Sequence, residues 1–162
     1  MSGTLESIEK SIDLTQLKTL CDRLAQRVGR GDCILLYGPL GSGKTQFVTC
    51  LAEALNCTDQ VSSPTYGLAN FYHTDSAPIL HIDTYRLADQ AEFRQLGLDE
   101  YFDSHLVLVE WADKVRSDFE DPLEVTIAFP ESDADASVRQ LTLSWQSKHW
   151  QAKVEHALQG IG

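Results

Sequence analysis

The 162-residue chain is acidic and globular in composition, with 43% hydrophobic residues and a formal net charge of −11 at pH 7. A chain of this length builds one ordinary hydrophobic core, so we expect a single domain over residues 1–162. The negative charge argues against an intrinsic role in holding nucleic acid, because phosphate backbones are bound by clusters of Lys and Arg.

The amino-terminal residues predict neither a secretory signal nor a membrane span. Met1 to Ile12 carries Glu6, Glu9 and Lys10 and has no long apolar core. We therefore expect a cytoplasmic protein that does not associate with membranes. The cysteines lack Cys-x-x-Cys spacing, which favours buried free thiols over zinc ligands or disulfides. They are Cys21, Cys33, Cys50 and Cys57.

The first predicted elements are a short edge strand and an amphipathic helix. Leu5 to Ile12 alternates weakly between apolar and polar residues. Asp13 and Gln16 form a predicted capping pair at the start of the helix, and apolar residues recur at helical spacing up to Val28. Simple packing explains most of this helix.

A complete Walker A sequence follows the apolar run 33–37, with Gly-Pro-Leu-Gly-Ser-Gly-Lys-Thr at residues 38–45. Its glycines permit turns that direct backbone amides at one anion, and the predicted helix Gln46–Leu55 directs its positive end to the same place. Lys44 can reach the outer phosphates and Thr45 can ligate Mg²⁺. The residues predicted to bind a nucleotide here are Gly38, Leu40, Gly41, Ser42, Gly43, Lys44, Thr45 and Gln46.

A Gly-rich turn without function is the alternative, but the strand before the loop and the helix after it favour nucleotide binding. Thr15, in the first turn of the upstream helix, could contact the base.

After the loop helix, the turn-rich segment Val61–Gly67 leads into a predicted strand, Leu68–His73. Thr65 is a candidate for a switch residue that senses the terminal phosphate through Mg²⁺, and a plain Ser-Pro-Thr turn is the alternative.

Two apolar strands then end in an acid, Ile79–Asp83 and Leu106–Glu110. Each has the Walker B form, in which a buried parallel strand delivers a carboxylate to the phosphate end of the sheet. One acid would serve the metal and another could orient water. An ordinary strand end with a helix-capping acid is the alternative for each, but the presence of both favours at least one active carboxylate.

The region between and beyond these strands predicts further layers of the fold. Residues 88–102 indicate two short helices, and Arg86 is either an arginine finger or, more simply, an ion-pair partner of Asp83 or Asp89. Trp111 belongs either to the core or to a stacking face near the site, and its place beside a strand end favours the stacking face. The tail predicts a hairpin of strands 123–129 and 137–145, followed by a helix over 146–158.

Taken together, these motifs resemble the TsaE family, small ATPases of bacterial tRNA threonylcarbamoyladenosine synthesis. The resemblance covers residues 29–114 and includes the Walker A sequence. Its other motifs are Ser-Pro-Thr-Tyr at 63–66, His-Ile-Asp-Thr-Tyr-Arg-Leu at 81–87, Leu-Gly-Leu-Asp-Glu-Tyr-Phe at 96–102 and Glu-Trp-Ala-Asp-Lys at 110–114. Pro39 departs from the acidic residue expected second in the family's loop, and Ser42 replaces a common Ala.

The resemblance implies an α/β, P-loop NTPase fold with a central parallel sheet, antiparallel edge strands and flanking helices. It implies that Lys44 and the loop amides hold ATP, and that Thr45 and Glu110 serve Mg²⁺. Glu110 then also counts among the catalytic residues. It further implies that Thr65 is the switch, that Asp83 is needed for hydrolysis, and that Trp111 lies near the nucleotide.

The family acts on a complex of the TsaD and TsaB proteins, which implies that tRNA is met only indirectly, through the complex. The acidic charge is compatible with that role. A small-metabolite kinase of the P-loop class is the main alternative, although the dispersed Arg94, Arg116 and Arg139 do not indicate an Arg-rich lid. A GTPase-type switch is disfavoured by the lack of an Asn-Lys-x-Asp sequence.

Overall fold

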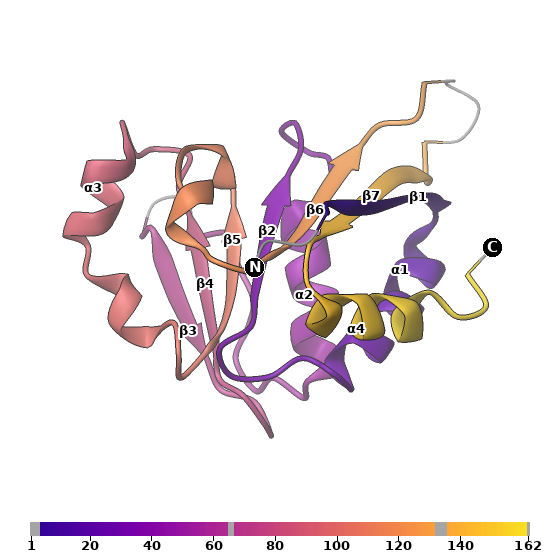
Figure 1. The fold of residues 1–162 in the computed structure, drawn as a ribbon, viewed down its shortest axis with the longest axis horizontal. Helices are drawn as coiled ribbons and strands as arrows, with labels where there is room; N and C mark the ends of the chain where they lie inside the picture. The colour runs from indigo at the N-terminus through magenta and orange to yellow at the C-terminus, as the bar shows by residue number, and fades with distance from the viewer. Residues whose placement is uncertain (1–3, 65–66, 132–135, 162) are drawn as a thin grey trace.

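The computed structural model describes residues 4–64, 67–131 and 136–161, which form a mixed seven-stranded sheet with flanking helices (Figure 1). The strands are β1 (Glu6–Ile12), β2 (Cys33–Tyr37), β3 (Ala69–Tyr72), β4 (Ile79–Asp83), β5 (Leu106–Glu110), β6 (Leu123–Ala128) and β7 (Arg139–Trp145). The α-helices are α1 (Leu14–Ala25), α2 (Lys44–Ala54), α3 (Gln90–Gln95) and α4 (Lys148–Leu158). Short 3-10 turns are η1 (Leu98–Tyr101), η2 (Ala112–Lys114) and η3 (Arg116–Asp118).

The sheet has a parallel centre and antiparallel flanks, in the order β1-β7-β6-β2-β5-β4-β3. Strands β6, β2, β5 and β4 run parallel, whereas β7, β1 and β3 each pair antiparallel with their neighbours. This arrangement confirms the predicted parallel sheet with antiparallel edges, including the predicted hairpin of β6 and β7. Strands β4 and β5 are buried along their whole length because both of their faces are covered.

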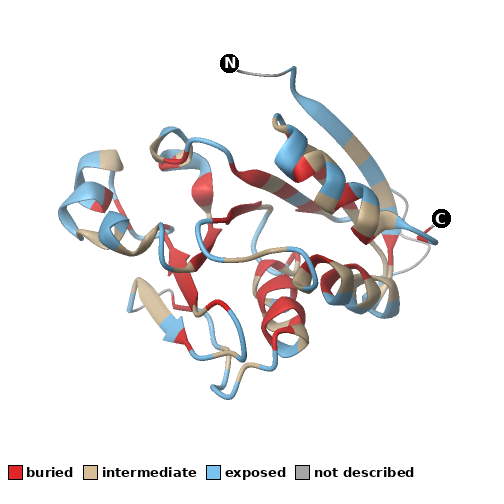
Figure 2. Ribbon diagram, turned by 60° about the horizontal axis from the view of Figure 1, so that its bottom comes forward, coloured by how far each residue is buried: buried red, intermediate tan, exposed pale blue. Residues whose placement is uncertain are grey.

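Helices α1, α2 and α4 pack against one face of the sheet and share a single core cluster with it. Figure 2 shows the buried sides of these helices turned toward the strands. Trp150 of α4 is fully buried in this cluster, and its indole Nε1 donates to the Asp121 carbonyl at 2.8 Å. The other face of the central strands is covered by α3 and the segments around η2 and η3, which form a second cluster around Phe93 and Phe119.

The ends of the helices follow the predicted capping chemistry. Asp13 and Gln16 form a reciprocal capping box at the start of α1, with hydrogen bonds of 2.8 and 2.9 Å. The helix ends at Ala25, three residues before the predicted Val28, because the chain there turns toward Asp32. The Gly29 amide donates to the Asp32 carboxylate at 2.9 Å, which directs the chain into β2.

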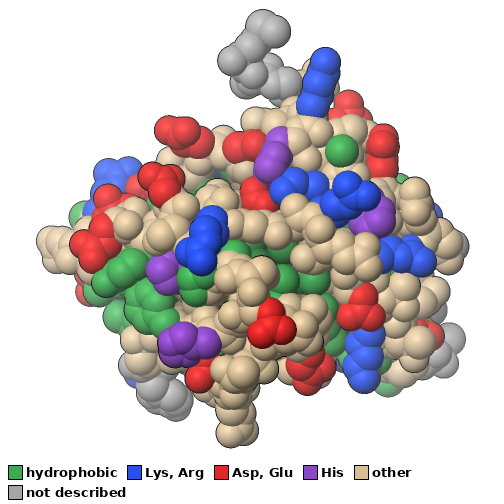
Figure 3. All heavy atoms as spheres, turned by 90° about the horizontal axis from the view of Figure 1, so that it is seen from below, with side chains coloured by type: hydrophobic (Ala, Val, Ile, Leu, Met, Phe, Trp, Pro, Cys, Tyr) green, Lys and Arg blue, Asp and Glu red, His purple; other side chains and the backbone are tan. Residues whose placement is uncertain are grey.

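The carboxyl ends of β2, β4 and β5 meet at one edge of the sheet, where the 38–45 loop lies. Figure 3 shows the opposite end of the molecule, where exposed apolar side chains lie among charged groups of both signs. Cys21, Cys33 and Cys50 are buried free thiols, as predicted, and Cys57 is partly exposed. No helix within the described ranges is long and apolar enough to cross a membrane.

Candidate functional site

The loop 38–45 joins β2 to α2 through three residues with positive φ, Gly38, Gly41 and Gly43. Gly38 has the most restrictive surroundings, since a Cβ there would lie 2.3 Å from the Ile127 carbonyl oxygen. Gly43 precedes the first residue of α2 and supplies no side-chain cap. The first amides of α2 are therefore not capped by the N-cap side chain, and with the helix dipole they favour an anion at this position.

Lys44 extends over the loop that it follows. Its Nζ donates to the carbonyl oxygens of Gly38 at 2.7 Å and Pro39 at 3.0 Å. Desolvation lowers the pKa of Lys44, while the nearby carboxylates of Glu110 and Asp83 act in the opposite direction. The ammonium group therefore lies between the loop and two acids, in position to contact a phosphate on the loop.

Thr45 and Glu110 are in direct contact. The Thr45 Oγ1 hydroxyl donates to the Glu110 carboxylate at 2.9 and 3.0 Å. The contact follows from the topology, because β5 is the immediate neighbour of β2 and Glu110 is the last residue of β5. Of the two predicted acids, Glu110 is the one that meets the hydroxyl of the Walker A sequence.

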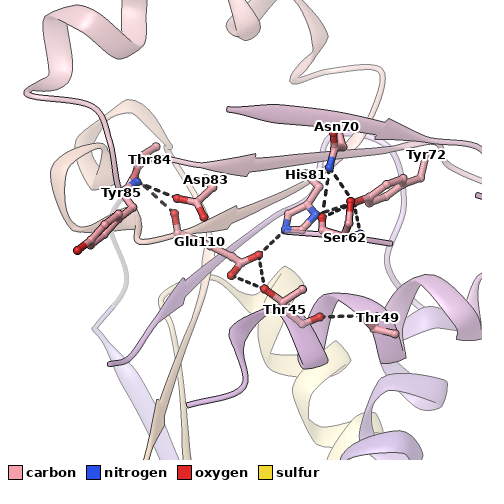
Figure 4. Close-up of polar contacts among 10 residues, drawn as sticks. All are labelled: Thr45, Thr49, Ser62, Asn70, Tyr72, His81, Asp83, Thr84, Tyr85 and Glu110. Carbon is pink, nitrogen blue, oxygen red and sulfur yellow. Dashed lines mark hydrogen bonds and ion pairs between the residues drawn. The ribbon is translucent and has the colours of Figure 1, made fainter. Parts of the chain in front are cut away.

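Asp83 ends the next strand and lies beside Glu110 in the β4–β5 register. Its side chain is almost completely buried and accepts a hydrogen bond from the Tyr85 amide at 2.8 Å. The two carboxylates therefore share one edge of the sheet, where the Thr45 hydroxyl donates to that of Glu110 (Figure 4).

Trp111 is held beside Lys44 by an unusual backbone conformation. It has a positive φ of 57°, and the hydroxyl of the buried Thr84 donates to its carbonyl oxygen. The indole ring lies 3.9 Å from Lys44 Nζ and packs against Tyr85. The structure thus places Trp111 at the site rather than in either core cluster.

The remaining predicted residues differ in their surroundings. Ser42 is buried, and its Oγ has no hydrogen-bond partner within the described part of the chain. Leu40 is 85% exposed at the tip of the loop. Thr65 lies outside the described residues.

A cavity of about 420 Å³ adjoins the loop on the side of α1. Its walls combine residues 41–43 and Gln46 with the start of α1 and with apolar side chains of β6 and β7, including Ile127 and Leu141. Arg139 borders it and donates to the Ser42 carbonyl at 3.1 Å. The start of α1 does reach this cavity, but through Asp13, Leu14 and Leu17, whereas Thr15 is not part of its lining.

The site is of the kind that holds Mg²⁺ together with a phosphate group. Mg²⁺ is usually bound by one or two carboxylates, a hydroxyl and the substrate phosphates, not by an all-protein cage. Thr45 and Glu110 supply the hydroxyl and the carboxylate, and the buried Ser42 hydroxyl, without a partner among the described residues, lies beside Gly38 of the loop. The residues present therefore fit a Mg²⁺–nucleotide complex.

Sequence reasoning missed His81, which lies fully buried in the middle of β4 and contacts Glu110. The five histidines are scattered along the sequence, so their spacing does not predict a shared site. A signal was present, because His81 and Asp83 are two residues apart on a predicted strand and therefore share one face. Thr84, which holds the Trp111 carbonyl, carried no such signal.

Comparisons with known proteins agree with this arrangement. The family profile described as "Threonylcarbamoyl adenosine biosynthesis protein TsaE" matches residues 11–141. A TsaE protein of Streptomyces coelicolor is 33% identical over 138 residues, covering 83% of this chain and 93% of its own length. A TsaE protein of Bacillus subtilis is 39% identical over 104 residues, 64% of this chain, and the match spans just under two thirds of that relative, 65%.

A solved structure shares the fold over nearly the whole chain. The crystal structure of Bacillus subtilis YdiB superposes with a TM-score of 0.77 at 26% identity, covering 96% of this chain and 97% of that one. The family match covers most of the sequence, from the end of β1 into β7. The chain belongs to the TsaE family of threonylcarbamoyl adenosine biosynthesis proteins.

Proposed function

We propose that this chain has a P-loop NTPase fold, binds ATP with Mg²⁺ and hydrolyses it as the ATPase of tRNA threonylcarbamoyladenosine synthesis. The contact between Thr45 Oγ1 and the Glu110 carboxylate carries the proposal, because it joins a Walker A hydroxyl to a strand-end acid beside Lys44. Bound Mg²⁺ would supply charge neutralisation at the phosphate oxygens. The chain's own residues would hold the phosphates and keep the two carboxylates at one edge.

Each residue then has a distinct role in the proposed reaction. The amides at the start of α2 and the Lys44 ammonium bind the phosphates, while Thr45 and Glu110 hold the metal. Asp83, buried beside Glu110 in the register, is placed to orient the attacking water. Thr65 keeps the switch role that the family resemblance implies, and Trp111 borders the phosphate end through its contact with Lys44.

The cavity beside residues 41–43 is the proposed site of the adenine ring. It adjoins the start of the loop helix through Gln46 and is lined mainly by apolar side chains, as nucleotide-base sites usually are. The chain lacks the Asn-Lys-x-Asp sequence that reads guanine, which favours adenine. Leu17 lies on the α1 side of this cavity, so its replacement by a larger residue would fill the space.

We further propose that the partners are the TsaD and TsaB proteins, that tRNA is contacted only through their complex, and that the protein acts in the cytoplasm as one domain. The net charge of −11 supports an indirect relation to tRNA, because the chain itself is acidic.

The first experiment measures Mg²⁺-dependent ATP hydrolysis by the purified protein, alone and with purified TsaD and TsaB. We expect slow turnover alone, a clear change when the pair is added, and loss of nucleotide binding in Lys44→Ala. Lys18→Ala is the matched control, because Lys18 is an exposed lysine of α1 that does not line the cavity. Equal activity of the two variants would overturn the site assignment, and phosphorylation of a small acceptor would favour the metabolite kinase.

A second experiment tests the adenine cavity separately from the phosphate site. Leu17→Trp should weaken binding of a fluorescent ATP analogue by about tenfold, an effect of about 1.4 kcal/mol. Binding of inorganic triphosphate should stay within about twofold of wild type, because the loop is untouched. An equal loss for both ligands would show that the cavity does not hold the base, and tighter binding of GTP than ATP would contradict adenine selection.

A further inference from the structure

The buried imidazole of His81 connects the proposed metal ligand to a second strand. His81 Nε2 lies 2.6 Å from Glu110 Oε2, and His81 Nδ1 lies 2.9 Å from the Tyr72 hydroxyl on β3 (Figure 4). The His81 side chain has no exposed surface, and that of Glu110 is 3% exposed. Both ring nitrogens are therefore used, and neither bond competes with bulk water.

The Tyr72 hydroxyl is in turn fixed by the segment that precedes residue 65. The Ser62 amide donates to the hydroxyl oxygen at 3.3 Å, and the Asn70 side-chain amide donates to it at 3.3 Å. The Tyr72 hydroxyl lies within donating distance of the Ser62 carbonyl, at 3.1 Å, and that carbonyl also accepts from the Asn70 side-chain amide at 3.2 Å. A continuous series of polar contacts thus runs from Glu110 through His81 and Tyr72 to the Ser62 backbone.

Hydrogen-bond chemistry assigns the donor in the contact between His81 and Glu110. An ionised Glu110 carboxylate only accepts, so His81 Nε2 carries a proton toward it. At its other end, the Tyr72 oxygen accepts from two amides, and the hydroxyl lies within hydrogen-bond distance of both the Ser62 carbonyl and His81 Nδ1. Burial raises the pKa of Tyr72, which keeps this hydroxyl protonated. His81 Nε2 is therefore the donor to Glu110, and Tyr72 holds the ring at Nδ1.

We propose that His81 is a positioning residue that orients the Glu110 carboxylate toward Thr45 and Mg²⁺, and that Tyr72 holds the imidazole ring in place through Nδ1. This inference rests on the proposed function. A histidine retained only for packing would need no acceptor at Nε2, whereas here Nε2 meets the same carboxylate oxygen that Thr45 Oγ1 approaches at 3.0 Å. Partners that orient a metal ligand typically influence metal affinity or activity by about 10–100-fold.

The test compares His81→Gln and Tyr72→Phe with wild type. His81→Gln keeps a donor on the side chain but cannot reproduce both ring contacts, and Tyr72→Phe removes one hydroxyl while keeping the ring. We expect the Mg²⁺ concentration for half-maximal turnover to rise about tenfold in His81→Gln and about threefold in Tyr72→Phe. Affinity for a fluorescent ATP analogue without Mg²⁺ should be unchanged in both, because the phosphate loop is intact.

His149→Gln is the matched control, since His149 Nε2 lies 2.6 Å from the Asp32 carboxylate at the other end of the sheet. Its Mg²⁺ dependence should equal that of wild type. If His81→Gln also shows wild-type Mg²⁺ dependence while wild type turns over ATP, the inference is wrong. If wild type neither binds nor hydrolyses ATP, the proposed function fails instead.

A measurement without nucleotide distinguishes a failure of the inference about His81 from a failure of the proposed ATPase function. ¹⁵N NMR of the protein alone should show a protonated Nε2 for His81, whose ring signals are assigned by their absence in His81→Gln. In Tyr72→Phe the Nδ1 signal should shift, because its hydrogen-bond partner is gone. A His81 spectrum that is unchanged in Tyr72→Phe would overturn the role of Tyr72 whatever the ATPase assay shows.

Discussion

Two acid–histidine pairs of equal length lie at opposite ends of the parallel strands. Glu110 and His81 are 2.6 Å apart at the carboxyl ends, and Asp32 and His149 are 2.6 Å apart just before β2 begins. His81 is fully buried, whereas the His149 side chain is 49% exposed. Distance alone therefore does not separate a site residue from a structural one.

The other hydrogen-bond partners of each carboxylate distinguish the site pair, Glu110 and His81, from the structural pair, Asp32 and His149. Asp32 accepts from the Gly29 amide at 2.9 Å and from Lys153 Nζ at 3.0 Å. A backbone amide and a cation therefore hold this carboxylate, and the Lys153 contact attaches α4 to the start of β2. Glu110 is held by His81 and by the Thr45 hydroxyl, a group that can itself ligate a metal. A carboxylate whose partner is also a potential ligand can serve a bound ion without breaking the fold.

The largest effect expected from this comparison is on turnover in Glu110→Gln. Gln keeps the shape and can still accept from Thr45 and His81, but it lacks the charge that serves Mg²⁺. We expect kcat to fall about 100-fold, corresponding to about 2.7 kcal/mol in the barrier, with the melting temperature nearly unchanged. Steady-state ATPase assays and thermal melts check this. Wild-type turnover in Glu110→Gln would remove the distinction between the two pairs.

The next effect concerns the loop that faces Glu110. Gly38→Ala would place a Cβ 2.3 Å from the Ile127 carbonyl at a φ of 147°, so the loop must shift. We expect nucleotide binding to be lost and the free energy of unfolding to fall by about 1–3 kcal/mol. Gly29→Ala is the control, because a Cβ there meets nothing within 4 Å. Calorimetry of both variants with ATP distinguishes them, and tight binding by Gly38→Ala would contradict the close approach.

Asp32→Asn should show the reverse profile of Glu110→Gln. The substitution removes the charge of a buried side chain and weakens its contacts to Lys153 and His149, which we expect to cost about 1–3 kcal/mol of unfolding free energy. The melting temperature should fall by about 2–4 °C for each kcal/mol. At a temperature where the variant stays folded, kcat should equal that of wild type. A loss of kcat without a loss of stability would show that the Asp32 pair reaches the site.

The parallel centre of the fold was predictable because its signals are local. The apolar runs 79–83 and 106–110 each end in an acid, and the structure has β4 and β5 with those bounds. The Walker A sequence, the capping box of Asp13 and Gln16 and the β6–β7 hairpin were equally readable, since each depends on neighbours within a few residues.

The site contacts that were missed depend on strand register, which no local pattern specifies. Antiparallel pairing places Asn70 opposite His81 and Tyr72 opposite Ile79, and this brings the Tyr72 hydroxyl to the imidazole. The cavity likewise requires β7 and α1 to meet beside the loop, so Leu141 and Leu17 line one space although they are distant in sequence. Thr15 was the nearest sequence-based candidate and does not line the cavity, which the start of α1 reaches through Asp13, Leu14 and Leu17 instead.

The smallest effect is expected for His149→Gln, the counterpart of His81→Gln. His149 is half-exposed, and Lys153 and the Gly29 amide continue to hold Asp32 when the imidazole is removed. Exposed ion pairs contribute little, so we expect a loss of about 0.5 kcal/mol or less in unfolding free energy, measured by urea denaturation at low salt. Because solvent screening weakens this pair, the difference from wild type should shrink further as salt is added. A loss above about 2 kcal/mol would mean that Lys153 and the Gly29 amide do not hold Asp32 without the imidazole, and that its other partners are not what makes this pair structural.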